Sequence, residues 1–298
     1  MKNLSNPINN RVAVLLAAYN GLKWIEEQVN TILQQHGVSV HLFISVDLST
    51  DGTYEWCKNL ETSNDNITVL EYGERFGGAA KNFFRLIKDV DFYSFDYVAF
   101  SDQDDIWLSN KLTHAVKLIT TQNLDVCSSD VMAFWKDGRE MLVKKSFPQQ
   151  HYDYHFEAAG PGCTYVFKAD AIQSFKAFLI ENWVSVNQVD LHDWMIYAYC
   201  RSNGLQWSID DTPLMRYRQH ESNQVGFNSG LKAYLKRISL VKGNWYRIEV
   251  EKIMAVLSTA GHTEFTLNRS FLIKHFLQLR RRPRDALALL SMLVLGVF

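Results

Sequence analysis

The chain has 298 residues, of which 47% are apolar and 21% are charged. This composition is typical of a globular protein and excludes a disordered or low-complexity chain. The chain has 31 Lys and Arg and 32 Asp and Glu. The resulting net charge of -1 gives no reason to expect nucleic acid as a partner.

The four cysteines indicate a reducing environment. Cys57, Cys127, Cys163 and Cys200 form no Cys-x-x-Cys pair, a spacing that favours neither zinc nor a secreted disulfide framework. We therefore expect buried thiols and a cytoplasmic protein. The start of the chain, Met1–Arg11, is polar, so we expect no signal peptide, and no run reaches the roughly 18 apolar residues of a membrane-spanning helix.

Apolar runs alternate with amphipathic segments over the first hundred residues. The runs are short and continuous, as in strands buried on both faces. The predicted strands are Arg11–Ala18, Val40–Val46, Ile67–Tyr72 and Tyr97–Phe100. The predicted helices between them are Leu22–Gln35, Thr53–Leu60 and Ala79–Val90. This alternation indicates βαβ units and a parallel sheet.

The alternation is less regular in the second part of the chain. The predicted helices there are Lys111–Thr121, Asp170–Trp183 and Leu191–Arg201, and the predicted extended segments are Val126–Trp135, Cys163–Phe167 and Trp207–Tyr217. Asp137-Gly138 is a hairpin signal. From Leu231 onward the pattern is mostly helical and basic. The sequence thus predicts one α/β domain over residues 1–225 and a helical extension over residues 226–298.

Polar side chains follow three of the predicted strands. They are Tyr19-Asn20-Gly21, Asp47 and Asp102-Gln103-Asp104-Asp105. In an open α/β sheet, ligands bind outside the carboxyl ends of the strands. Three acids on one turn repel each other unless water or a cation offsets their charge. Carboxylate oxygens suit Mg²⁺ or Mn²⁺, which also hold phosphate oxygens. The sequence has neither a P-loop nor a Gly-x-Gly-x-x-Gly motif after the first strand.

These segments resemble a known family. Val14–Gly21, Val46–Thr53 and Ser101–Leu112 are similar to the family 2 inverting glycosyltransferases of the GT-A fold. The Asp-Gln-Asp-Asp-x-Trp run resembles the bacterial rhamnosyltransferases of O-antigen and related polysaccharides. The later segments that fit the same subset are Gly162–Thr164, His192–Trp194 and Tyr217–Asn223. The resemblance implies a Rossmann-like, mostly parallel central sheet flanked by helices.

The resemblance also implies roles for individual residues. Asp193 corresponds to the general base, and Asp47 to the acid that accepts a hydrogen bond from N3–H of uracil or thymine. The residues expected to contact the nucleotide sugar are Ala17, Tyr19, Asp47, Lys81, Asp102 and Gln103. The residues expected in the acceptor or sugar pocket are Trp107, Gly162, Cys163, Thr164, His192 and Trp194. The residues expected at an Mg²⁺ or Mn²⁺ ion are Asp104, Asp102 and His220.

Two departures from the family pattern weaken parts of this assignment. Val46-Asp47-Leu48-Ser49 lacks the first acid and the glycine usual in that loop, and Ala17-Ala18 lacks the hydroxyl residue often found before Tyr19. Several of the residues also have structural alternatives. Tyr19 could pack over the sheet edge, Asp47 could cap the Ser49–Gly52 loop, His220 could be an ordinary histidine, and Asp193 could be a helix N-terminal acid.

The expected reaction is a single displacement that inverts the anomeric centre. By resemblance the donor is dTDP-L-rhamnose and the acceptor is a saccharide hydroxyl, carried on a lipid, in bacterial surface polysaccharide synthesis. UDP-glucose, UDP-galactose or a UDP-N-acetylhexosamine are alternative donors. A nucleotidyltransferase would need a glycine-rich basic loop after the first strand, which Tyr19–Leu22 is not. A non-catalytic sugar-binding homologue is disfavoured by the intact Asp102, Asp104 and Asp193.

The C-terminal end combines basic and apolar residues. Arg280, Arg281, Arg282 and Arg284 precede the apolar run Ala286–Phe298. This pattern predicts a peripheral contact with the cytoplasmic face of the inner membrane. The alternative is a buried terminal helix or a homodimer contact.

Overall fold

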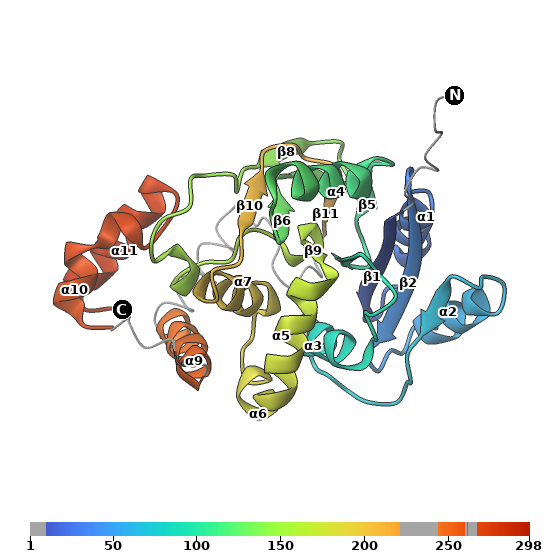
Figure 1. The fold of residues 1–298 in the computed structure, drawn as a ribbon, viewed down its shortest axis with the longest axis horizontal. Helices are drawn as coiled ribbons and strands as arrows, with labels where there is room; N and C mark the ends of the chain where they lie inside the picture. The colour runs from blue at the N-terminus through green and yellow to red at the C-terminus, as the bar shows by residue number, and fades with distance from the viewer. Residues whose placement is uncertain (1–9, 221–243, 260, 262–266) are drawn as a thin grey trace, which may run out of the picture.

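The computed structural model describes residues 10–220, 244–259, 261 and 267–298. A seven-stranded sheet lies at its centre between layers of helices (Figure 1). In spatial order its strands are β10 (Trp207–Asp210), β6 (Val126–Ser129), β9 (Val166–Lys168), β4 (Tyr97–Ser101), β1 (Asn10–Ala18), β2 (Val38–Val46) and β3 (Ile67–Val69). β9 runs antiparallel to β4 and β6, and the other pairs are parallel. The predicted mostly parallel sheet is confirmed.

The carboxyl ends of the three central strands meet at one edge of this sheet. Ala18 of β1 pairs with Val46 of β2, and Leu16 of β1 pairs with Ser101 of β4. β1 is buried on both faces, as its continuous apolar run predicts. Because the strands are parallel and in this register, the residues that follow them emerge side by side at the edge where open α/β sheets bind ligands.

A second, smaller sheet extends the first. Its strands, in spatial order, are β5 (Ile106–Trp107), β11 (Met215–Gln219), β7 (Val131–Trp135) and β8 (Glu140–Val143). β7 and β8 form an antiparallel hairpin around Gly138, whose φ of +85° favours glycine, so the predicted hairpin is confirmed. β11 places Gln219 and the following His220 near the loop after β4.

Two segments predicted to be extended are each divided between the two sheets. Val126–Trp135 breaks at Asp130, whose buried carboxylate accepts hydrogen bonds from the backbone N–H groups of Lys145 and Ser146. These bonds direct the chain out of one sheet and into the other. Trp207–Tyr217 breaks before Pro213, which cannot donate a hydrogen bond to a strand partner. The predicted extended conformation is confirmed, and each segment forms two strands.

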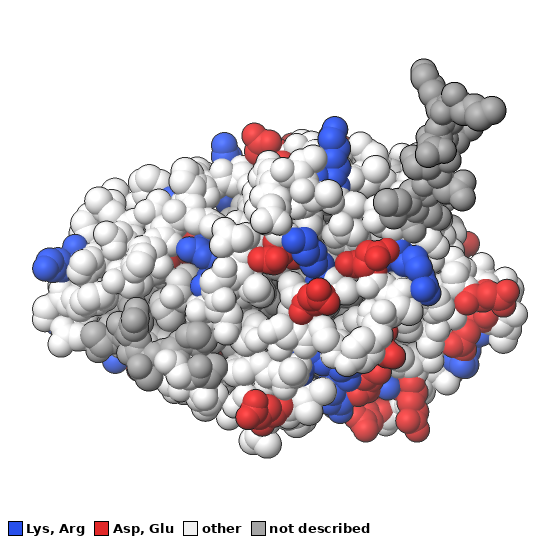
Figure 2. All heavy atoms as spheres, viewed as in Figure 1, with Lys and Arg blue, Asp and Glu red and all other residues white. Residues whose placement is uncertain are grey.

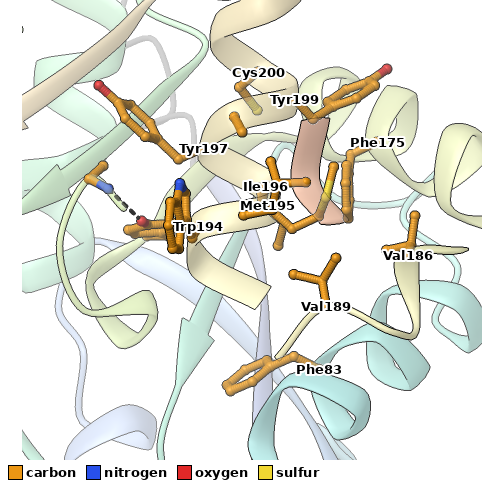
Figure 3. Packing of buried hydrophobic residues seen from close by; sticks show 14 of the residues in the cluster. Phe83, Phe175, Val186, Val189, Trp194, Met195, Ile196, Tyr197, Tyr199 and Cys200 are labelled. Atoms are coloured by element: carbon orange, nitrogen blue, oxygen red, sulfur yellow. Dashed lines mark hydrogen bonds between the residues drawn. The ribbon is translucent and has the colours of Figure 1, made fainter. Parts of the chain in front are cut away.

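Helices cover both faces of the central sheet. On one face lie α1 (Ile25–Leu33), α2 (Thr53–Glu61) and α4 (Lys111–Gln122), and on the other lie α3 (Ala79–Asp89), α5 (Ala169–Glu181), α6 (Trp183–Val186) and α7 (His192–Ser202). Figure 3 shows how residues of α7 pack against Phe83 of α3 and Phe175 of α5. Short 3-10 turns complete the fold at η1 (Asp153–His155), η2 (Gly162–Thr164) and η3 (Phe276–Gln278).

The C-terminal helices share this core. α9 (Trp245–Thr259), α10 (Arg269–Lys274) and α11 (Pro283–Leu295) are the described part of the expected helical extension. Ile253 of α9 and Leu289 of α11 belong to the same hydrophobic cluster as α7. The expected boundary at residue 225 lies outside the described residues. None of the helices in the described ranges is long and apolar enough to span a membrane.

The basic residues before α11 do not form one exposed patch. Arg281 is buried, and its guanidinium lies 3.2 Å from the Asp153 carboxylate and 3.4 Å from Glu157. Arg280 donates hydrogen bonds to the Phe156 carbonyl oxygen at 3.2 Å and to the Tyr246 hydroxyl at 2.9 Å. The interpretation of four adjacent arginines as one membrane-facing cluster is wrong, because two of them bind the C-terminal segment to the rest of the core.

Candidate active site

Tyr19 follows β1 and is held in place by Gln103, which follows β4. The Tyr19 backbone N–H donates to Gln103 Oε1 at 2.8 Å, and Gln103 Nε2 donates to the Tyr19 carbonyl oxygen at 2.9 Å. A Cβ on Gly21 would lie 2.1 Å from Gln103 Oε1, so the contact requires glycine there. The Tyr19 side chain itself is exposed and free to meet a planar ligand. Gln103 thus positions Tyr19, whereas the sequence placed it only at the donor.

Asp47 is buried at the end of β2 and holds a neighbouring loop. Its carboxylate accepts hydrogen bonds from the backbone N–H groups of Leu48, Phe76 and Gly77, at 2.7, 2.9 and 2.9 Å. A carboxylate offers about four lone-pair sites, so one remains for a ligand. The Ser49–Gly52 loop is capped by Asp51, which accepts from the Thr53 N–H, and the alternative that gave this role to Asp47 is wrong.

Two further residues expected at the donor lie along the same edge. Ala17 is buried in β1, two residues before Tyr19, with its side chain in the core. Lys81 is exposed in the first turn of α3, directly after the loop that Asp47 holds. Lys81 is therefore the one of the two whose side chain is exposed to solvent near the loop that Asp47 holds.

Two of the three acids after β4, Asp104 and Asp105, are fixed by contacts with β11 and with His220, which follows it. His220 Nε2 lies 2.7 Å from Asp104 Oδ2. The Arg218 backbone N–H donates to Asp105 Oδ1 at 3.0 Å, and Arg218 Nε donates to the Asp104 carbonyl oxygen at 2.7 Å. The Arg218 guanidinium also stacks over the Trp24 ring at 4.5 Å. Sequence reasoning missed Arg218 and Asp105, although both lie inside the motifs that it used.

The carboxylates are crowded in a poorly solvated space. Burial raises the pKa of Asp102 to about 7, and the neighbouring Asp104 carboxylate adds to the increase. Burial and the charges of Asp104 and Asp102 raise the pKa of Asp105 as well. One oxygen of Asp102, one of Asp105 and the Cys163 sulfur lie within 4.8 Å of one another. The negative charge would be relieved by a cation.

The residues fit a divalent cation, with one change from the predicted ligand set. Asp105 Oδ2 is buried and accepts no hydrogen bond in the described structure. Such an oxygen, close to Asp102 and Asp104, is a ligand atom that Mg²⁺ or Mn²⁺ prefers. The predicted set is divided, because Asp104 pairs with His220 while Asp102 clusters with Asp105. Asp105 is therefore added to the residues that could bind the cation.

Asp193 lies at the N-terminus of α7, near the same cluster. Its Oδ1 accepts a hydrogen bond from the Trp194 backbone N–H at 2.8 Å. Burial raises the pKa of Asp193 to about 6, against the opposing effects of that N–H and of the Lys145 charge. The Asp193 charge in turn raises the pKa of Asp102, which places the two carboxylates within electrostatic reach. An aspartate with a pKa near 6 can accept a proton at neutral pH.

The loop before β9 packs directly against the start of α7. A Cβ on Gly162 would lie 2.4 Å from His192 Nε2 and 3.3 Å from Asp193 Cβ, so only glycine permits this approach. Cys163 is fully buried, with its sulfur at the acidic cluster. The Thr164 hydroxyl donates to the Pro161 carbonyl oxygen at 2.7 Å and closes the turn. This loop thus forms the wall between the acids after β4 and Asp193.

Three aromatic residues expected in the sugar pocket lie in the core. His192 stacks on Phe83 with ring centroids 4.1 Å apart, and burial lowers its pKa to about 3, so it is neutral. Trp194 is buried among the residues drawn in Figure 3, and its indole N–H donates to the Tyr154 carbonyl oxygen. Trp107 is buried beneath the Lys111 ammonium, which lies 3.7 Å from its ring centroid. These side chains do not reach a surface that a sugar could contact, so they are removed from the expected pocket.

The site lies at the ends of parallel strands, where an aromatic residue and a cluster of acids lie near a buried aspartate. In an α/β fold, this arrangement is typical of a transferase that uses a nucleotide-bound donor. Residues 13–181 match the family model described as glycosyl transferase family 2. The chain belongs to that family, and the predicted membership is confirmed.

Individual proteins give the same picture. The chain is 44% identical over 289 residues to the dTDP-rhamnosyl transferase RfbG of Shigella flexneri, covering 95% of this chain and 100% of that protein. Staphylococcus aureus TarS, in a crystal structure with UDP-GlcNAc, is 16% identical with a TM-score of 0.55, over 95% of this chain and 81% of that one. Mannosyltransferase PcManGT from Pyrobaculum calidifontis, in complex with GDP-Man and Mn²⁺, is 15% identical with a TM-score of 0.52, over 98% and 87%. The predicted GT-A fold is confirmed.

Proposed function

We propose that this glycosyltransferase moves L-rhamnose from dTDP-L-rhamnose to a hydroxyl of a saccharide acceptor in bacterial surface polysaccharide synthesis. The observation that carries the proposal is the 44% identity, over 95% of the chain, to a protein named as a dTDP-rhamnosyl transferase. The site supports a nucleotide donor without choosing the sugar. UDP-glucose, UDP-galactose and a UDP-N-acetylhexosamine remain the alternatives to test.

The proposed chemistry is one displacement with inversion. The acceptor oxygen forms a bond to the anomeric carbon while the bond from that carbon to the β-phosphate oxygen of dTDP breaks. The acceptor proton passes to the Asp193 carboxylate, and dTDP leaves with the electron pair of the broken bond. Asp193 supports this role because burial raises its pKa to about 6, close to the operating pH, where a general base is most effective.

The nucleotide would occupy the edge formed by the ends of β1 and β2. Tyr19 offers an exposed ring for stacking, and the unused lone pair of Asp47 can accept from N3–H of thymine. Lys81, in the first turn of α3, could meet the diphosphate. All three residues flank the loop that Asp47 fixes.

Mg²⁺ or Mn²⁺ would be held by Asp102, Asp104, Asp105 and His220. When bound, such a cation would offset the charge of the departing diphosphate. The crowded carboxylates and the unpartnered Asp105 oxygen support a cation there.

We further propose that the acceptor is carried on a lipid and that the enzyme works in the cytoplasm. Four buried free thiols are consistent with a reducing compartment. The acceptor would approach Asp193 across the Gly162–Thr164 loop, which separates that residue from the acids after β4.

A donor panel tests this function. The full chain would be incubated with Mg²⁺ or Mn²⁺, lipid-diphosphate-linked saccharides and, separately, dTDP-L-rhamnose, UDP-glucose, UDP-galactose and UDP-N-acetylglucosamine. We expect product only, or fastest, with dTDP-L-rhamnose. A faster reaction with one of the UDP sugars would show that this UDP sugar is the donor, and the proposed glycosyl transfer would still stand.

A further inference from the structure

The outer side of the C-terminal helix is apolar. In α11, Leu287 is 54% exposed, Val294 57% and Leu295 75%, at a spacing that places them on one stripe. The Ser291 hydroxyl, in the same stripe, donates to the Leu287 carbonyl oxygen, so its polar group is satisfied within the helix. Ile273 and Leu277, from α10 and η3, are also exposed. We call these five apolar residues the C-terminal stripe.

The inner side of α11 shows why the stripe faces outward. Ala286, Leu289 and Leu293 are buried, and the two leucines belong to the hydrophobic cluster shared with α7 and α9. The helix is therefore already anchored by one face, and packing against the core cannot account for the second apolar face. An exposed apolar face on a helix that is already anchored to the core by its other face indicates a contact with a partner or a membrane.

Cations flank the C-terminal stripe. Arg284 begins α11 and is exposed, Lys274 is exposed at the end of α10, and Arg269 donates to the Val294 carbonyl oxygen at the other end of α11. Asp285 is the only acid between Leu267 and Phe298. On the face shown in Figure 2, this end of the molecule is mostly uncharged with Lys or Arg atoms at its tip. The stripe is thus an apolar surface within a positive field.

We propose that the C-terminal stripe docks on an anionic lipid surface, with Arg269, Lys274 and Arg284 at the headgroups. Apolar side chains on one face of a helix enter the boundary between headgroups and acyl chains, and basic residues beside them attract anionic lipids. A second copy fits less well, because it would bring two surfaces of the same positive sign together. The proposal rests on this surface and is independent of the donor sugar.

Point variants of the whole chain are a better test than truncation, because removal of residues 280–298 would also remove Arg281 from its buried pairs with Asp153 and Glu157. Binding would be measured by co-sedimentation with vesicles of phosphatidylcholine alone and of phosphatidylcholine with 30% phosphatidylglycerol, at about 0.05 and 0.5 M salt. We expect binding to the anionic vesicles at low salt and release at high salt, where charges are screened.

Two variants separate the apolar and the charged contributions. K274Q/R284Q should weaken partitioning about 25-fold, since each cation near an anionic surface contributes about fivefold. L287S/V294S/L295S should weaken binding to the anionic vesicles at low salt although all its cations are kept. The matched control is Y93S/R139Q, which changes an exposed aromatic and an exposed cation outside the C-terminal helices and should bind as the wild type does. Thermal unfolding would verify that each variant is folded.

Two results would overturn the proposal. The first is equal pelleting of the wild type, K274Q/R284Q and L287S/V294S/L295S, or no pelleting of the wild type at low salt. The second is a wild-type dimer in analytical ultracentrifugation that the L287S/V294S/L295S variant converts to a monomer, which would make a second copy the occupant. Neither readout uses donor or acceptor, so failure here is distinct from failure of the proposed function.

Discussion

The side-chain amide of Gln103 forms two hydrogen bonds with the backbone of Tyr19, although the two residues are 84 positions apart in the sequence. One bond accepts the Tyr19 N–H and the other donates to the Tyr19 carbonyl oxygen. The strand end that offers an aromatic ring is thereby fixed to the strand end that carries the acids. A displacement of one side of the site is expected to move the other.

Substitutions at Gly21 and Gln103 test this connection. Gly21→Ala should weaken dTDP binding about tenfold or more, because the new Cβ would lie 2.1 Å from Gln103 Oε1 and break the pair of bonds. In a Gln103→Ala background the same change should have little further effect, because the clash is gone. Isothermal titration of all four proteins gives the coupling. Strictly additive losses would contradict the connection.

Asp193→Asn tests the base. We expect donor affinity to be unchanged and kcat to fall about 10²–10⁴-fold, because an amide cannot accept the proton. The wild-type rate should decline as the pH falls through about 6, where Asp193 becomes protonated, and the variant should lack this decline.

The matched control for Asp193 is Asp190→Asn. Asp190 accepts a hydrogen bond from Trp245 Nε1 and lies 3.4 Å from the Lys252 ammonium, away from the acidic cluster. The turnover rate of Asp190→Asn should stay within about twofold of the wild-type rate. A normal rate for Asp193→Asn would show that another residue is the base.

Removal of metal tests the acidic cluster. Exhaustive EDTA treatment should abolish turnover, and added Mg²⁺ or Mn²⁺ should restore it. His220→Ala should weaken Mn²⁺ binding, followed by electron paramagnetic resonance, about 10–100-fold, because His220 either binds the ion or orients Asp104. Full turnover after EDTA, or unchanged Mn²⁺ affinity, would refute the proposed cation site.

Asp47→Asn should affect folding as well as nucleotide binding. The amide would turn an NH₂ group toward backbone donors that now point at a carboxylate, which costs about 1–3 kcal/mol of unfolding free energy. The exposed Asp65→Asn is the control and should unfold like the wild type. Chemical denaturation measures both, and an unchanged stability for Asp47→Asn would show that the loop contact is dispensable.

Arg281→Met should destabilise the whole chain by about 3–5 kcal/mol, because the buried Asp153 carboxylate would lose the Arg281 charge and keep only Arg201 and the Tyr197 hydroxyl as described partners. Arg284→Met removes a 75% exposed side chain and should change stability by less than about 0.5 kcal/mol. Equal unfolding midpoints for the two variants would contradict the role of Arg281 in joining the C-terminal helices to the core.

The parallel strands of the first half of the chain and the position of the site could be predicted from the sequence because both depend on local patterns. β1 is a continuous apolar run, and the residues that follow β1, β2 and β4 must emerge at one edge of a parallel sheet. The break at Asp130 could not be predicted, since its cause is the backbone of Lys145 and Ser146.

Long-range partners explain the other differences. Asp47 meets backbone donors 29 and 30 residues away, and Arg281 meets an acid 128 residues away. The position of Trp194 in the sequence motif is the same whether its side chain lines a pocket or fills the core. Only the packing of α7 against its neighbours decides between the two. A sequence pattern identifies which residue types gather at a strand end, but it does not identify what each side chain contacts.

The product of one reaction tests the central claim most directly. Wild type and Asp193→Asn would be given dTDP-β-L-rhamnose, Mg²⁺ and a lipid-linked saccharide acceptor, and the glycosidic bond would be characterised by NMR. We predict an α-L-rhamnoside from the wild type and at least about 100-fold less of it from the variant. A β-linked product, or an equal yield from Asp193→Asn, would contradict an inverting displacement with Asp193 as the base.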